Sequence, residues 1–198
     1  MIIVPPARVG TDTLRRGVMR VAENVHVGGQ TAPDAVRDTA PEAAPDAVRI
    51  RPATAQDAEA VTGVFLASRA AAMPYLPRVH SDEDTLAWIT HVVLPTSTAV
   101  RVAERAGEGG ELLGFAVLAG DDELDHLYLR PDALRRGIGS RLLAEVREAA
   151  GGPLNLYVFQ RNTTARAFYE RHGFTAVAFD DGSRNEENEP DVLYHWAP

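Results

Sequence analysis

Cysteine is absent from this chain of 198 residues, which excludes disulfide bonds, cysteine nucleophiles and thiolate metal sites. Lysine is absent as well, since all 20 basic residues are arginine, and this excludes Schiff-base chemistry on a lysine of the chain. No apolar run reaches the roughly 18 residues that span a bilayer, and the first residues lack the basic flank of an export signal. These absences predict a cytoplasmic protein whose fold depends on ordinary packing.

Positive charge is in short supply. The chain has 28 acidic and 20 basic residues, which gives a net charge of −8. Sequence-independent binding of nucleic acid depends on clustered positive charge, so we expect no nucleic-acid partner. Hydrophobic residues make up 45% and charged residues 24% of the chain, which is typical of a globular protein with a real core. The acidic balance suits cationic partners better than anionic ones.

The chain divides into a leader and a domain. Residues 1–47 hold few aliphatic clusters, and Pro33, Pro41 and Pro45 prevent a continuous helix at their end. We predict a flexible leader over residues 1–47 and one domain over residues 48–198. The leader has five arginines against six acidic residues and the domain has fifteen against twenty-two, so the acidity belongs to the domain.

Regular hydrophobic patterns begin at residue 48. Helices are predicted after the capping box Thr54–Asp57, from Ser81, after the glycines near residue 138, and over 162–172. Strands are predicted over 48–51, 98–104, 111–118, 123–129, 154–159, 174–179 and 191–196. An antiparallel meander thus precedes one clear crossover, which does not fit a regular doubly wound sheet. The pattern predicts an α/β (α+β) fold with a mixed, mostly antiparallel central sheet.

A glycine pair opens the third predicted helix. The strand that ends at Leu129 is followed by Arg135-Arg136-Gly137-Ile138-Gly139. A helix start exposes about four backbone N–H groups, and glycines let an anion approach them closely. Gly-x-Gly alone is more often an ordinary turn. A dinucleotide fingerprint lacks its third glycine, since position 142 is Leu142, and a phosphate-binding loop lacks its lysine.

A second pattern lies on the helix predicted over 162–172. Asn162, Ala165 and Tyr169 are three and then four residues apart, so they share one helical face. Taken singly, Asn162 is most simply a helix cap and Tyr169 a core aromatic. Taken together, and one strand and one helix after a glycine anion site, they indicate a binding surface.

These two patterns resemble the motifs of the GNAT superfamily, the acetyl-CoA-dependent N-acetyltransferases. The family's Arg/Gln-x-x-Gly-x-Gly/Ala motif corresponds to residues 134–139, with Leu134 in place of the usual Arg or Gln. Its second motif is matched by Asn162, Ala165 and Tyr169, followed by Gly173-Phe174. The resemblance covers residues 48 to about 196. It implies a GNAT-like fold, with a splayed parallel strand pair in the sheet, and acetyl-CoA as cosubstrate.

The resemblance also assigns roles to residues. Tyr169 would protonate the departing CoA thiolate, and Glu123 is our first choice for the base that deprotonates the amine. Asp125 and His126 remain alternatives for that base, and a solvated strand end is an equally good interpretation of all three. The predicted cosubstrate-binding residues are Leu127 and Leu129 through their backbone, Arg135, Arg136, Gly137, Ile138, Gly139, Ser140, Asn162 and Tyr169.

The acceptor amine is expected to bind between two segments far apart in the chain. The first is the proline-rich stretch 73–80 and the second is the acidic stretch 185–187, for which a solvated hairpin turn is the safer interpretation. The predicted substrate residues are Tyr75, His80 and Asp125. The histidines lack metal-site spacing, so no catalytic metal is expected.

The leading hypothesis is an enzyme that transfers acetyl to a primary amine of a small molecule by direct attack in a ternary complex. A protein N-terminal acetyltransferase is the nearest alternative among enzymes. From other classes, the domain would be a non-catalytic acyl-CoA sensor, or the leader would bind a partner. The resemblance also allows a homodimer through the C-terminal strands.

Overall fold

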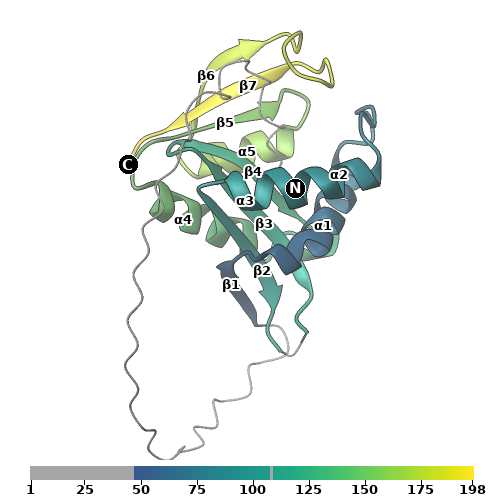
Figure 1. Ribbon diagram of the computed structural model, residues 1–198. Coiled ribbons are helices and arrows are strands. Elements are labelled where there is room, and N and C mark those ends of the chain that lie inside the picture. Colours follow the sequence, from purple (N-terminus) through teal and green to yellow (C-terminus); the bar gives the residue numbers. More distant parts are fainter. Residues whose placement is uncertain (1–46, 108) are drawn as a thin grey trace, which may run out of the picture.

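Seven strands form one sheet in the order β1-β2-β3-β4-β5-β7-β6. The structure is a computed structural model that describes residues 47–107 and 109–198 (Figure 1). The predicted leader lies outside the described residues apart from residue 47. The strands are β1 (Val48–Pro52), β2 (Ala99–Arg105), β3 (Leu112–Ala119), β4 (Glu123–Leu129), β5 (Leu154–Phe159), β6 (Thr175–Asp180) and β7 (Asp191–Trp196).

Helices cover both faces of this sheet. On one side α1 and the continuous helical run that follows it pack on β2, β3 and β4. On the other side α4 packs on the same three strands, and α5 contributes to the same hydrophobic cluster as α4. The helices are α1 (Ala58–Ala72), α2 (Asp82–Trp88), α3 (Leu94–Thr96), α4 (Ile138–Ala150) and α5 (Thr163–Arg171), with the short helical segments η1 (Ala55–Asp57), η2 (Ile89–Val93) and η3 (Pro131–Ala133). The predicted order of strands and helices is confirmed.

Local sequence explains where α1 begins and which face it buries. The Thr54 backbone N–H donates to the Asp57 carboxylate at 2.7 Å, which is half of the predicted capping box. Val61, Val64 and Phe65 recur at helical spacing and are buried against the sheet. No described helix combines the length and the apolar character that a membrane crossing needs.

A bulge in β4 decides which side chains face α1. Val117 pairs with His126 but Leu118 pairs with Leu124, so Asp125 is an extra residue without a partner on β3. An undisturbed strand would point Asp125 and His126 to opposite faces. Because of the bulge, both contribute to the α1 side: Asp125 lines a cavity there, and the His126 ring lies among the aromatic rings of that side.

The sheet opens between β4 and β5. All neighbouring strands pair antiparallel except these two, and their parallel register contains the single Cα pair Glu123↔Asn155. Beyond that pair the edge of β4 has no ladder with β5. The predicted splayed parallel pair and the mostly antiparallel sheet are thereby confirmed, and α4 and α5 follow the open ends of these two strands in the chain.

Candidate active site

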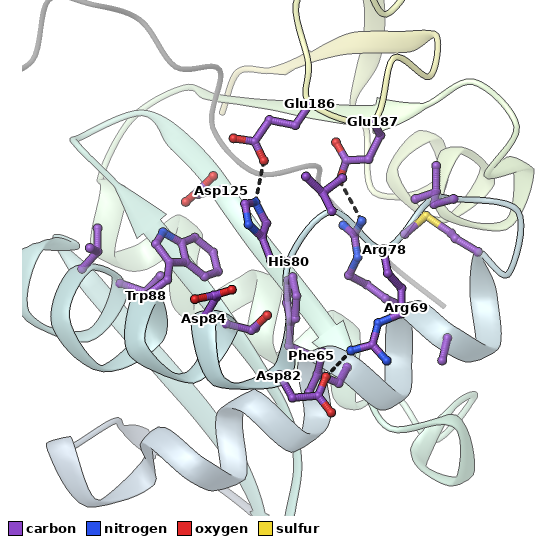
Figure 2. Close-up of a pocket in the computed structure, with 18 of the residues that line it drawn as sticks. Phe65, Arg69, Arg78, His80, Asp82, Asp84, Trp88, Asp125, Glu186 and Glu187 are labelled. Carbon is purple, nitrogen blue, oxygen red and sulfur yellow. Dashed lines mark hydrogen bonds and ion pairs between the residues drawn. The ribbon is translucent and has the colours of Figure 1, made fainter.

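A cavity of about 1260 Å³ lies on the α1 side of β4 (Figure 2). Its walls come from α1, the segment 73–80, α2, the start of β4 and the connection between β6 and β7. The two predicted acceptor segments therefore meet in one cavity. Figure 2 shows His80 of the first segment facing Glu186 of the second, with 2.8 Å between Nε2 and Oε2.

The connection between β6 and β7 folds inward to form part of this wall. Gly182 has φ +87°, and a Cβ there would lie 2.5 Å from the backbone carbonyl carbon of Glu189, so only glycine fits. The Asn185 side-chain amide donates to the Glu189 carbonyl at 2.9 Å and to the Asp191 carboxylate at 3.0 Å. The interpretation of this stretch as a solvated turn is wrong for Glu187, which is buried.

A buried ion pair fastens that connection to α1. The Arg69 guanidinium donates to Glu187 Oε1 at 2.7 Å, and the two side chains are only 18% and 3% exposed. Burial opposes the charge of Arg69, yet Tyr128 and Glu187 together hold its pKa above the usual value. Burial likewise raises the pKa of the Tyr128 hydroxyl, which Arg69 only partly offsets. Arg69 thus stays cationic and Tyr128 stays neutral.

The predicted base candidates lie at the start of β4. Glu123 and Asp125 both line the cavity, whereas His126 is fully buried behind them. Asp125 is 7% exposed, and its Oδ1 has no hydrogen-bond partner among the described residues. The His126 ring centroid lies 5.3 Å from that of Trp88 and 5.7 Å from that of Tyr128. Which of these groups acts as base stays a prediction.

Tyr169 occupies the other side of the sheet. It belongs to the hydrophobic cluster with α4, whereas Tyr128 belongs to the cluster with α1. Burial, followed by the electrostatic effect of Tyr128, raises the pKa of Tyr169 well above its usual value. Within the described residues its hydroxyl has no hydrogen-bond partner. The Tyr169 hydroxyl therefore stays protonated, and the electrostatic effect of Tyr128 indicates that it lies near β4.

The glycine segment before α4 has an unusual backbone. Gly137 is the N-cap of α4 with φ +76°, and no side chain of the described residues caps this helix start. Arg135 has φ +60°, a conformation that costs a residue with a Cβ about 1–2 kcal/mol. Strain of this kind persists where the surrounding structure or a function requires it. Because the Ile138 side chain is buried in the core, only its backbone can face a ligand.

The remaining predicted cosubstrate residues differ in what they can offer. Leu127 and Leu129 bury their side chains on the α4 side, which leaves their backbone groups. The Ser140 hydroxyl is 2.9 Å from His172 Nε2, so it is already engaged. Asn162 caps α5 by accepting from the Ala165 N–H at 3.1 Å, while its Nδ2 is buried with no acceptor among the described residues.

Some residues stand apart from these expectations. Tyr75 is not among the residues that line this cavity, because its ring packs 3.9 Å from the Arg161 guanidinium. Leu134 packs against the core on the α4 side, which explains why a leucine is accepted there. Sequence reasoning missed Arg69, Glu187 in its buried state and Trp88, and nothing local to those residues marks them. The described residues include no group of three or more His, Asp or Glu side chains arranged to hold a metal.

Comparison with known proteins gives the class of this site. Residues 96–176, about two fifths of the chain, match the family model for the acetyltransferase (GNAT) domain. The resemblance indicated by the two motifs is confirmed, and both glycines of the first motif and all three residues of the second lie inside the matched segment.

Particular relatives can also be named. The chain is 35% identical over 89 residues to the peptidyl-lysine N-acetyltransferase YiaC of Escherichia coli K12, which is 45% of this chain and 59% of that protein. It resembles a GCN5-related N-acetyltransferase of Rhodopseudomonas palustris (23% identity, TM-score 0.62, 76% of this chain and 95% of the other). It also resembles the PaiA N-acetyltransferase of Thermoplasma acidophilum in complex with coenzyme A (20% identity, TM-score 0.58, 77% and 99%). The two structural likenesses concern the fold.

Proposed function

We propose that this protein is an acetyl-CoA-dependent N-acetyltransferase that acts on a primary amine of a small molecule. The observation that carries the proposal is a proton donor and an acidic cavity on opposite sides of β4. A protonated Tyr169 lies on the α4 side of β4 and β5, and an acidic cavity that contains Asp125 lies on the α1 side. The GNAT domain and the coenzyme A complex of the Thermoplasma neighbour support the same function.

Acetyl-CoA has matching groups on the α4 side. Its pyrophosphate would bind the N–H groups at the start of α4, from Gly137 to Ser140, with Arg135 and Arg136 adding positive charge. Its pantetheine arm would lie along the open edge of β4 at Leu127 and Leu129, as a strand partner would. The side-chain amide of Asn162, which has no acceptor in the described structure, supplies a further donor.

The reaction then needs two proton transfers on opposite sides of β4. An alkylamine has a pKa near ~10.4, so it arrives as an ammonium and loses a proton to Glu123 or Asp125. The free amine attacks the thioester carbonyl, and a backbone N–H near Leu129 stabilises the oxyanion by about 3 kcal/mol. The C–N bond forms, the C–S bond breaks, and the Tyr169 hydroxyl gives its proton to the thiolate.

Tyr169→Phe tests this assignment. The change removes one oxygen and no packing, so we expect acetyl-CoA affinity to stay within about twofold while turnover falls about 100-fold. Calorimetry gives the affinity, and release of free thiol in the presence of an amine panel gives the turnover. Equal losses in affinity and turnover would mean that Tyr169 binds the cosubstrate and does not act as the acid.

A lysine side chain of a peptide is a second candidate acceptor. The relative from Escherichia coli is named as a peptidyl-lysine N-acetyltransferase, which favours it. The amine panel therefore includes a lysine peptide and a peptide whose only amine is its N-terminus. Tight binding of acetyl-CoA without thiol release for any amine would instead indicate an acyl-CoA sensor.

A further inference from the structure

We infer that the acceptor carries at least one more cationic group besides the amine that reacts, as a diamine or a longer polyamine does. This inference rests on the proposed function and narrows its substrate class. It comes from the charge of the cavity, from two buried oxygen atoms in its walls, and from the placement of those atoms on separate elements of the fold.

The cavity contains far more negative than positive charge. Seven carboxylates and two guanidinium groups line it. Both guanidinium groups are already paired with a carboxylate of the same cavity, Arg69 with Glu187 and Arg78 with Asp82. Four of the other carboxylates have no arginine partner among the described residues. Asp84 contacts a serine hydroxyl, Asp122 an asparagine amide, and Asp125 and Glu186 each a histidine ring. One ammonium would balance only one of these charges.

Two buried oxygens indicate where cationic donors would bind. Asp125 Oδ1 and Glu187 Oε2 have no hydrogen-bond donor among the described residues, and both residues are more than nine-tenths buried. A buried carboxylate oxygen is costly unless a donor reaches it. An alkylammonium group is such a donor, since it offers three N–H groups and no acceptor.

These two oxygens belong to different walls of the cavity. Asp125 comes from the bulge in β4, next to the opening where the thioester would lie, and Glu187 comes from the connection between β6 and β7. A ligand that satisfies both needs one ammonium at each end. The first would be the reacting amine at Asp125, and the second would anchor the molecule at Glu187.

The wall between the charged groups suits an alkyl linker. Phe65, Met73 and Trp88 line the same cavity, and Figure 2 shows Trp88 and Phe65 beside its acidic groups. Methylene groups would pack on this surface, and a cation beside the Trp88 ring would gain further attraction. A free amino acid fits less well, because its carboxylate would meet an acidic cavity whose two arginines are already neutralised.

The test compares acceptors of equal length with the full chain and acetyl-CoA. 1,4-Diaminobutane and n-butylamine differ only in the second ammonium group. We expect kcat/KM for the diamine to exceed that for the monoamine by about 30-fold at low salt, and this ratio to fall at least threefold in 300 mM NaCl. Equal kcat/KM values, or a clear preference for the lysine peptide over both, would overturn the inference while acetyl transfer itself stands.

Glu187→Gln locates the second ammonium site. It removes the charge and keeps the acceptor that faces Arg69, so the ratio of diamine to monoamine kcat/KM should fall at least tenfold. Glu189→Gln is the matched control, because Glu189 is on the same connection and also has a buried oxygen without a partner, yet it does not line the cavity. This control should leave the ratio unchanged, and equal effects of the two variants would overturn the site.

Two further measurements keep the result interpretable. If Glu187→Gln does not fold, as judged by its circular dichroism, Glu186→Gln on the exposed rim should still lower the ratio about threefold, and no change would count against the inference. Acetyl-CoA binding is measured in every variant. Absence of both acetyl-CoA binding and acetyl transfer in the wild type would refute the proposed function itself, whereas transfer without diamine preference refutes only the inference.

Discussion

The two sides of β4 are built in different ways. On the α4 side, the groups predicted to hold acetyl-CoA come from short continuous stretches, and they are mainly backbone amides beside a neutral tyrosine. On the α1 side, the cavity is assembled from segments more than 100 residues apart, and its polar groups are charged side chains. The α4 side is therefore suited to a ligand that is the same in every reaction, and the α1 side to a ligand that can differ from one protein to another. In a transferase, that is the division between the donor and the acceptor.

The largest expected effect is a loss of stability on the α1 side. Arg69→Met removes one partner of the buried ion pair and leaves the Glu187 carboxylate uncompensated, so the free energy of unfolding should fall by about 3 kcal/mol. Urea unfolding followed by circular dichroism measures it. Arg78→Met is the control, because the Arg78–Asp82 pair is 70% and 59% exposed and should contribute less than about 1 kcal/mol. Similar losses in both variants would contradict the role given to burial.

A smaller loss of stability is expected at low pH, from the ion pair that links the start of α1 to β1. The Arg51 guanidinium lowers the pKa of Asp57 to about 2, and bonds from Thr54 assist against the opposing effect of burial. A lowered pKa gives stability that is present above the unfolded value near 3.8 and is lost as pH falls toward 2. Between pH 4 and pH 2 the wild type should therefore lose about 2 kcal/mol more than Asp57→Asn. The readout is urea unfolding at each pH.

The control for that measurement is Asp132→Asn. Asp132 is an exposed carboxylate whose pKa is also lowered, by the hydrogen bond from Arg130. Because solvent screens the pair, its removal should change the acid dependence much less than removal of Asp57 does. An acid dependence that is the same in wild type and Asp57→Asn would show that the Arg51–Asp57 pair does not hold α1 in place.

The smallest expected effects are changes in stability and in acetyl-CoA affinity on the α4 side. Arg135→Gly relieves the left-handed backbone, so thermal unfolding should show a gain of about 0.5–1 kcal/mol after the entropy cost of glycine. The same change removes a charge at the proposed pyrophosphate site and should weaken acetyl-CoA binding about fivefold by calorimetry. Arg135→Ala loses the charge but keeps the strain, so it should weaken binding equally without the gain in stability. Unchanged affinity in both variants would remove Arg135 from the cosubstrate site.

Several features of the fold were predictable because their causes are local. The strands from Ala99 to Leu129 alternate between buried positions of two clusters, and this alternation depends only on spacing along the chain. The cap at Asn162 and the glycine before α4 affect only residues that are a few positions away in the chain. The two motifs of the α4 side could be recognised for the same reason, since backbone amides and helix faces depend on spacing along the chain.

The α1 side was only partly predictable. The segments 73–80 and 185–187 were expected to meet, and His80 and Glu186 do so. The burial of Glu187 was not foreseen, because its partner Arg69 is 118 residues away in the chain. Tyr75 was expected in the pocket, but its ring packs with Arg161 instead. Side-chain direction in an irregular segment depends on neighbours that the local sequence does not name.

By itself, the sequence determined the order of the elements, the GNAT motifs and the acidic character of the domain, because periodicity, caps and charge are properties of short stretches. The tertiary structure decided how that acidity is used. The bulge at Asp125 turns a carboxylate toward α1, and the fold of the β6–β7 connection buries another against Arg69. Both depend on contacts between distant segments, since only packing in three dimensions sets which charges are buried, which are paired, and which are left to face a ligand.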